Sequence, residues 1–153
     1  MSDIEQYICV KDMERLLGQW KLKENIRFTK FLSFTQLPWY QIHIANHSHI
    51  DLHLHKISDM KYSKKVSSMF YNVEHTININ NTFTTHNDGK QIKYNLLDHK
   101  IITDIIGTIV NWQEIISFED PHLKIDYVWE ENGERKTASQ TFEKQTHEYE
   151  ESL

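Results

Sequence analysis

The stretch HSHIDLHLHK, residues 47–56, holds four of the ten histidines in the chain and is the first place to look for chemistry. Histidine is a common metal ligand, and a structural zinc site needs four ligands at about 2 Å from the ion. On a strand, residues two apart share a face, so His49, His53 and His55 lie together. Neighbours on that face are about 7 Å apart, so only His53 and His55 are placed to share a metal. We therefore predict a solvent-facing histidine row and no metal site, with a metal-binding or interaction module as the alternative.

The opposite face of the same stretch is apolar, because Ile50, Leu52 and Leu54 alternate with the polar residues. Similar alternation runs through residues 76–83 and 122–129. Strict alternation predicts half-buried strands. Turn-forming sequences such as ISDMK, NDGK, LDHK and ENGE separate the runs. Turns at intervals of about 8 to 12 residues are typical of an antiparallel meander, closed as a barrel or sandwich.

The segment near the N-terminus has a different pattern. The sequence LLGQWKLKE predicts a first strand, and two short helices follow it. In the first helix, Phe28, Phe31 and Leu32 have the i, i+3, i+4 spacing of one helical face. Pro38 suits the first turn of the second helix, whose apolar stripe includes Tyr40. The predicted order is therefore a strand, two helices, and a long series of strands.

Length and composition limit the class of protein. A chain of 153 residues with a net charge of −5 is most simply one domain, and it has no basic block for nucleic acid. Cys9 is the only cysteine, and the N-terminal residues lack the apolar core of a signal peptide. No apolar run approaches the roughly 18 residues of a membrane span. We expect a cytoplasmic protein with an N-terminal extension (1–13), a barrel domain (14–144) and an acidic tail (145–153).

An enzyme is not expected. The sequence shows no nucleophile and base arranged together and no pair of carboxylates at a plausible site. Only four glycines occur, and none forms a phosphate-binding loop. The sequence therefore predicts neither catalysis nor a cofactor.

The order of these elements resembles the intracellular lipid-binding proteins, the family of fatty-acid-binding and cellular retinoid-binding proteins. The resemblance covers roughly residues 14–144, and Phe70, Asn72, Glu74 and Phe83 are in step with the family pattern. It is carried by five segments in order: LLGQWKL, IRFTKFLSFTQLPWYQIHIAN, SSMFYNVEHTININNTF, NDGKQIKYNLL and ASQTFEK.

The resemblance implies an all-β fold, a flattened ten-stranded antiparallel up-and-down barrel (β-clam, calycin-like) with a helix-turn-helix lid after the first strand. It also implies a monomeric carrier with an interior cavity for a fatty acid, a retinoid or a related lipid. The lid is expected to make transient contact with membranes. The residues implied for the cavity are Phe28, Phe31, Leu32, Leu52, Leu54 and Phe70. Those implied for the portal are Trp39, Tyr40, Tyr71 and His86.

The positions that bind the ligand head group depart from the usual family pattern. Members that bind fatty acids or retinoic acid commonly use two inward arginines and a tyrosine. This chain has Gln113, Gln140 and Phe142 at the matching positions. Glutamine hydrogen-bonds an alcohol or aldehyde but does not neutralise a carboxylate. The resemblance thus implies an uncharged ligand like that of the retinol-binding branch.

Two alternatives stay open beside this expectation. The first is a fatty-acid carrier that holds the carboxylate elsewhere. The second is a secreted lipocalin, which shares the hollow barrel. A signal peptide and a pair of cysteines would favour the lipocalin, and the sequence shows neither.

Overall fold

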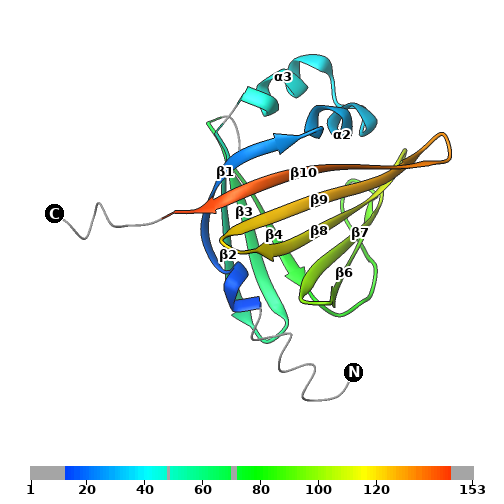
Figure 1. Cartoon of the computed structure of the whole chain (residues 1–153). Helices are drawn as coiled ribbons and strands as arrows, with labels where there is room; N and C mark the ends of the chain where they lie inside the picture. Colours follow the sequence, from blue (N-terminus) through cyan, green and yellow to red (C-terminus); the bar gives the residue numbers. More distant parts are fainter. Residues whose placement is uncertain (1–12, 48, 70–71, 146–153) are drawn as a thin grey trace.

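The computed structural model describes residues 13–47, 49–69 and 72–145. A ten-stranded sheet curls around an interior, and two helices follow its first strand (Figure 1). In chain order the elements are η1 (Glu14–Leu16), β1 (Gly18–Ile26), α2 (Phe28–Phe34), α3 (Trp39–His47), β2 (Asp51–Ser58), β3 (Lys61–Ser67), β4 (Asn72–Asn78), β5 (Thr84–Thr85), β6 (Gln91–Leu97), β7 (Lys100–Ile106), β8 (Asn111–Glu119), β9 (His122–Glu131) and β10 (Glu134–Lys144).

The strands follow an up-and-down order, β4-β3-β2-β1-β10-β9-β8-β7-β6-β5, in which each neighbouring pair is antiparallel. The first and last strands pair with each other, from Trp20 opposite Lys144 to Ile26 opposite Ser139. An isolated parallel bridge joins Ile79 to Tyr94 at the open edge of the curl. The predicted ten-stranded antiparallel fold with a helical lid is confirmed.

The alternation in the sequence decides which side chains face inward. On β2, Leu52 and Leu54 are buried while His55 is exposed. On β9, Leu123, Ile125, Tyr127 and Trp129 are all buried. Such alternation places every second residue on the inner face of the sheet. The outward position of the histidine row is therefore as predicted.

The two lid helices differ in how they pack. Phe28 and Phe31 of α2 are buried against the barrel. On α3, by contrast, Tyr40 and Ile44 of the expected apolar stripe are 51% and 37% exposed, so this stripe is not buried against the barrel. Pro38 precedes α3, and its carbonyl accepts hydrogen bonds from the N–H groups of Gln41 and Ile42. Among the described residues, no helix has the length and apolar character needed to cross a lipid bilayer.

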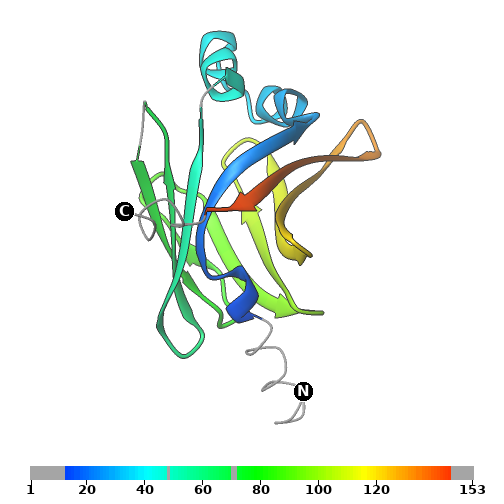
Figure 2. The same ribbon diagram turned by 60° about the vertical axis from the view of Figure 1, so that its left-hand side comes forward.

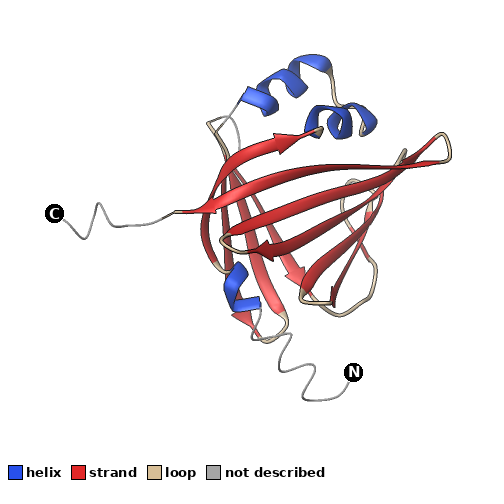
Figure 3. Cartoon of the chain, in the orientation of Figure 1, coloured by secondary structure: helices blue, strands red, loops and turns tan. Residues whose placement is uncertain are grey.

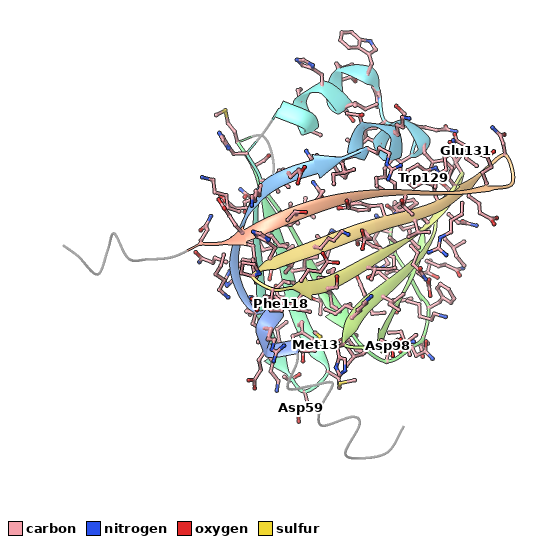
Figure 4. All side chains as sticks on the ribbon, in the orientation of Figure 1. Met13, Asp59, Asp98, Phe118, Trp129 and Glu131 are labelled. Atoms are coloured by element: carbon pink, nitrogen blue, oxygen red, sulfur yellow. The ribbon has the colours of Figure 1, made fainter. Side chains whose placement is uncertain are left out.

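The end of the barrel opposite the lid is filled by apolar side chains. Figure 2 and Figure 3 show η1 at this end and α2 and α3 at the other. Met13, Leu16 and Trp20 are each 1% exposed, and Trp20 Nε1 donates a hydrogen bond to the carbonyl of Leu16 at 3.0 Å. Figure 4 labels Met13 at this end of the barrel. Met13, the described residue of the expected N-terminal extension, is thus part of the core.

Candidate ligand-binding cavity

A cavity of about 300 Å³ lies inside the barrel beneath α2. Its wall consists mainly of apolar and aromatic side chains on alternate strand positions. A volume of this order is at the lower end for small-molecule sites. The lining residues are Phe31, Leu32, Thr35, Lys64, His75, Ile77, Lys90, Ile92, Tyr94, Thr103, Ile105, Trp112, Glu114, Ile116 and Tyr127.

An ion pair crosses this cavity. Lys64 Nζ on β3 lies 3.4 Å from each carboxylate oxygen of Glu114 on β8. The two side chains are only 12% and 15% exposed. A charge removed from water is costly unless it is paired, so each partner makes the other tolerable here. Lys90, the other lysine in the wall, lies 3.3 Å from a carboxylate oxygen of Asp88.

Two titratable groups beside the pair are held neutral. Burial lowers the pKa of the His75 imidazole, and the positive charges of Lys64 and Lys90 lower it further. Burial, assisted by the negative charge of Glu114, raises the pKa of the Tyr94 phenol to about 12. At neutral pH the wall therefore offers a neutral imidazole and a protonated phenol, both able to hydrogen-bond a ligand.

Gln140 on β10 is buried next to Tyr127 of this wall, with a relative exposure of 4%. Its Oε1 accepts a hydrogen bond from the Tyr127 hydroxyl at 2.6 Å. Its Nε2 donates to Oδ1 of Asn25 on β1 at 3.1 Å. Both ends of the amide are thus engaged, and Tyr127 is the member of this network that lines the cavity.

Gln113 lies on the other side of the sheet, which corrects the predicted Gln113–Gln140 pair. Its Nε2 donates to Oδ1 of Asp104 at 2.8 Å, and Asp104 is also 3.6 Å from Lys93. The inner face of β8 carries Trp112, Glu114 and Ile116 instead. A shift of one residue along a strand exchanges its two faces, and the prediction aligned this strand one residue away from its actual register.

The other predicted cavity residues fall into two groups. Phe31 and Leu32 line the cavity. Phe28, the first residue of α2, packs beside them, with its ring centroid 6.1 Å from that of Phe31 and 5.3 Å from that of Tyr127. The second group, in the packed core, comprises Leu52, Leu54 and Phe142, each at most 2% exposed. Phe70 and Tyr71 lie outside the described residues.

Three of the predicted portal residues lie in the part of the chain that the structure describes: Trp39 and Tyr40 on the lid, and His86. Trp39 and Tyr40 project from α3, and their rings meet edge to face at 6.1 Å. His86 lies in the turn between β5 and β6, where its backbone N–H donates a hydrogen bond to the backbone carbonyl of Lys90 at 2.8 Å. The exposed aromatic rings give α3 an apolar outer surface.

The histidine row on β2 brings two rings together. The ring centroids of His53 and His55 are 5.2 Å apart. Within the described residues, no group of three or more histidine, cysteine, aspartate or glutamate side chains is placed to hold a metal ion.

The charged pair inside the cavity was missed by reasoning from the sequence. A local signal for each residue exists. Lys64 stands between Tyr62 and Val66 on the inward positions of β3, and Glu114 stands between Trp112 and Ile116 on β8. A charged residue in an apolar row is a candidate for a buried polar site. The sequence does not show, however, that these two strands face each other.

Many solved structures share this fold, whereas two comparisons of the sequence found no match. Neither a protein-family model nor a curated protein sequence matches this chain. Fatty-acid-binding protein 1 of Echinococcus granulosus superposes with a TM-score of 0.75 at 15% identity, covering 87% of this chain and 99% of that one. A Schistosoma mansoni fatty acid binding protein in complex with arachidonic acid gives a TM-score of 0.75 at 16% identity, covering 88% and 99%.

A third solved structure agrees. Apo lipid binding protein 8 of Caenorhabditis elegans gives a TM-score of 0.77 at 15% identity and covers 87% of this chain and 97% of that chain. At such identities the likeness establishes the fold. The chain has the fold of the fatty-acid-binding proteins, as the resemblance in its sequence implied.

Proposed function

We propose that this protein is a non-enzymatic intracellular carrier that binds a long-chain hydrophobic ligand, such as a fatty acid, a retinoid or a related lipid, inside the barrel. The observation that supports this most is the cavity beneath α2, whose wall is largely apolar. Removing a hydrocarbon chain from water stabilises the complex by about 0.8 kcal/mol per CH₂. The solved Schistosoma mansoni protein, which shares the fold, is in complex with arachidonic acid.

The charges in the cavity favour a ligand with an uncharged head group, such as an alcohol or aldehyde. Each lysine in the wall already has a carboxylate partner. A ligand carboxylate near Lys64 would also meet the negative charge of Glu114, and like charges at short range in a poorly hydrated site repel strongly. Gln140 contributes its neutral amide through Tyr127, whose hydroxyl it positions at the wall. The ligand is thus expected to be retinol-like in its head group.

Ligand entry is proposed at the lid. Trp39 and Tyr40 form the exposed face of α3, and aromatic side chains are favoured at membrane interfaces. Arg27 and Lys30, both exposed at the start of α2, would add a weak attraction to anionic lipids. Transfer of ligand to vesicles should accelerate as their anionic lipid content rises. A transfer rate that does not depend on the anionic lipid content would refute this charge-assisted membrane contact.

Native mass spectrometry tests the carrier function directly. The protein is purified under mild conditions and its bound small molecules are identified. A stoichiometric long-chain lipid supports the proposal. A protein that emerges without lipid, and that binds none when long-chain alcohols and acids are added, refutes it.

A further inference from the structure

Two adjacent strands of the barrel separate close to the lid. Pairing between β8 and β9 stops at Gln113 and Val128. Yet β8 stays paired with β7 as far as Asn111, and β9 stays paired with β10 as far as Glu131. Residues 111–112 of β8 and 129–131 of β9 therefore do not pair with each other. This leaves a wedge-shaped gap between the two strands. Figure 4 places Trp129 and Glu131 at this end, close to α2.

This wedge, the gap between residues 111–113 and 128–130, holds a second cavity of about 450 Å³. Its floor is made by inward-facing apolar side chains, Ile105, Trp112 and Trp129. Ile105 and Trp112 also line the interior cavity. The two cavities thus adjoin across these two side chains.

Trp112 and Trp129 give the floor particular properties. The Trp112 ring meets Phe31 of α2 edge to face at 5.8 Å, so this side chain joins the floor of the wedge to the lid. Trp129 is 3% exposed, and its Nε1 has no hydrogen-bond partner among the residues that the structure describes. The floor is thus not wholly apolar, because it contains a buried indole donor.

The rim of the wedge is polar and its charges are mixed. Asp104 accepts from Gln113 and lies 3.6 Å from Lys93. Arg135 and Glu130, which both line the wedge, occupy opposite positions of the β9–β10 ladder. A hydroxyl group both donates and accepts hydrogen bonds, so it suits such a rim better than a full charge of either sign.

We infer that the wedge binds the uncharged, hydroxyl-bearing head group of a lipid whose hydrocarbon chain occupies the interior cavity. This inference rests on the proposed carrier function and adds to it the place where the ligand leaves the barrel. The chain passes beside Trp112, between β8 and β9, so the head group leaves the interior next to Glu114, which is two residues from Trp112 on the inner face of β8.

Site-directed alkylation tests this placement. The probe is a long-chain monoacylglycerol with an iodoacetamide on its glycerol, so that a thiolate displaces iodide and forms a carbon–sulfur bond. In a Cys9→Ser background, Gln113→Cys places a thiol in the wedge. Ile115→Cys is the matched control, because residue 115 has the same outward orientation on β8 and does not line the wedge. Rates are normalised to those with iodoacetamide itself.

The Gln113→Cys variant should be alkylated at least about tenfold faster than the control, because bound probe has a high effective concentration at the wedge. Unmodified monoacylglycerol should slow only that reaction. Equal normalised rates, or a rate that the competitor leaves unchanged, overturn the inference. Displacement of a fluorescent lipid by monoacylglycerol is measured in parallel. Displacement without selective alkylation refutes the wedge alone, whereas no binding of any lipid refutes the carrier function and the wedge together.

Discussion

Lys64 Nζ lies 3.4 Å from both carboxylate oxygens of Glu114, across the interior of the barrel and 50 positions away in the sequence. The pair joins β3 to β8 through the space where a ligand would lie. The positive charge of Lys64 and the negative charge of Glu114 compensate each other inside the cavity. This compensation determines which ligand head groups the interior accepts.

The substitution Glu114→Gln should strengthen the binding of a long-chain fatty acid by about tenfold or more. It removes the repulsion of the ligand carboxylate and leaves Lys64 available as its partner, a change of roughly 1–3 kcal/mol. Isothermal titration with acid and alcohol of equal chain length measures it. Glu119→Gln, at the exposed end of the same strand, serves as the control and should change neither affinity. An unchanged acid affinity in Glu114→Gln would show that the pair does not select the head group.

Breaking the pair from its other side should destabilise the fold. Lys64→Met leaves the Glu114 carboxylate without its partner in a site where it is 15% exposed. Loss of one partner of a buried pair costs about 3 kcal/mol, whereas an apolar replacement of both is much less costly. Urea unfolding of Lys64→Met, Glu114→Leu and the double variant measures the coupling. Strictly additive losses would contradict a direct interaction.

His75 should make the folded state sensitive to acid. Its pKa is lowered from 6.5 by burial and by Lys64 and Lys90, with a smaller contribution from His86, while Glu114 opposes the shift. As the pH falls, the unfolded chain therefore takes up this proton before the folded chain does. The stability from neutral His75 is complete above pH 6.5 and is lost below it, until the folded-state pKa is reached.

Urea unfolding between about pH 7.5 and about pH 5 measures this slope. The His75→Gln variant should lose part of it. The His55→Gln variant, changed at an exposed position on β2, should keep it. Identical slopes in the wild type and in His75→Gln would contradict the neutral, buried state of this side chain.

The Tyr127–Gln140 hydrogen bond should contribute measurably to stability. Tyr127→Phe leaves Oε1 of Gln140 without its 2.6 Å donor in a buried position. An unsatisfied buried acceptor costs about 1–3 kcal/mol. A double-mutant cycle with Gln140→Leu, followed by urea unfolding, measures the coupling. Tyr40→Phe on the exposed lid is the control. If the losses of unfolding free energy in the two single variants add up to the loss in the double variant, the hydrogen bond does not contribute to stability.

The fold was predictable because its main signal is local. Alternation around Leu52, Leu54 and Leu123 identified strands, and the i, i+3, i+4 spacing of Phe28, Phe31 and Leu32 identified the first lid helix. Each pattern is repeated often enough for errors at single positions to have no effect on the topology. The second helix was placed correctly, but the packing of its apolar stripe was not, because the sequence does not distinguish exposed residues such as Tyr40 and Ile44 from buried ones.

The head-group site was less predictable for a physical reason. On β8 both faces carry apolar residues, Trp112 and Ile116 on one and Ile115 on the other, so alternation alone does not fix the register. The comparison with family motifs selected Gln113, one residue from the inward-facing Glu114. Only the contact with Lys64 explains why a carboxylate is tolerated there, and that contact depends on the closure of the whole barrel.

The most direct test of the account is a competition between retinol and a long-chain fatty acid for the purified wild-type protein, followed by native mass spectrometry. Retinol should displace the acid from the wild-type protein, and Glu114→Gln should reverse this preference. A wild-type protein that retains the fatty acid against excess retinol, with no change in Glu114→Gln, would contradict it.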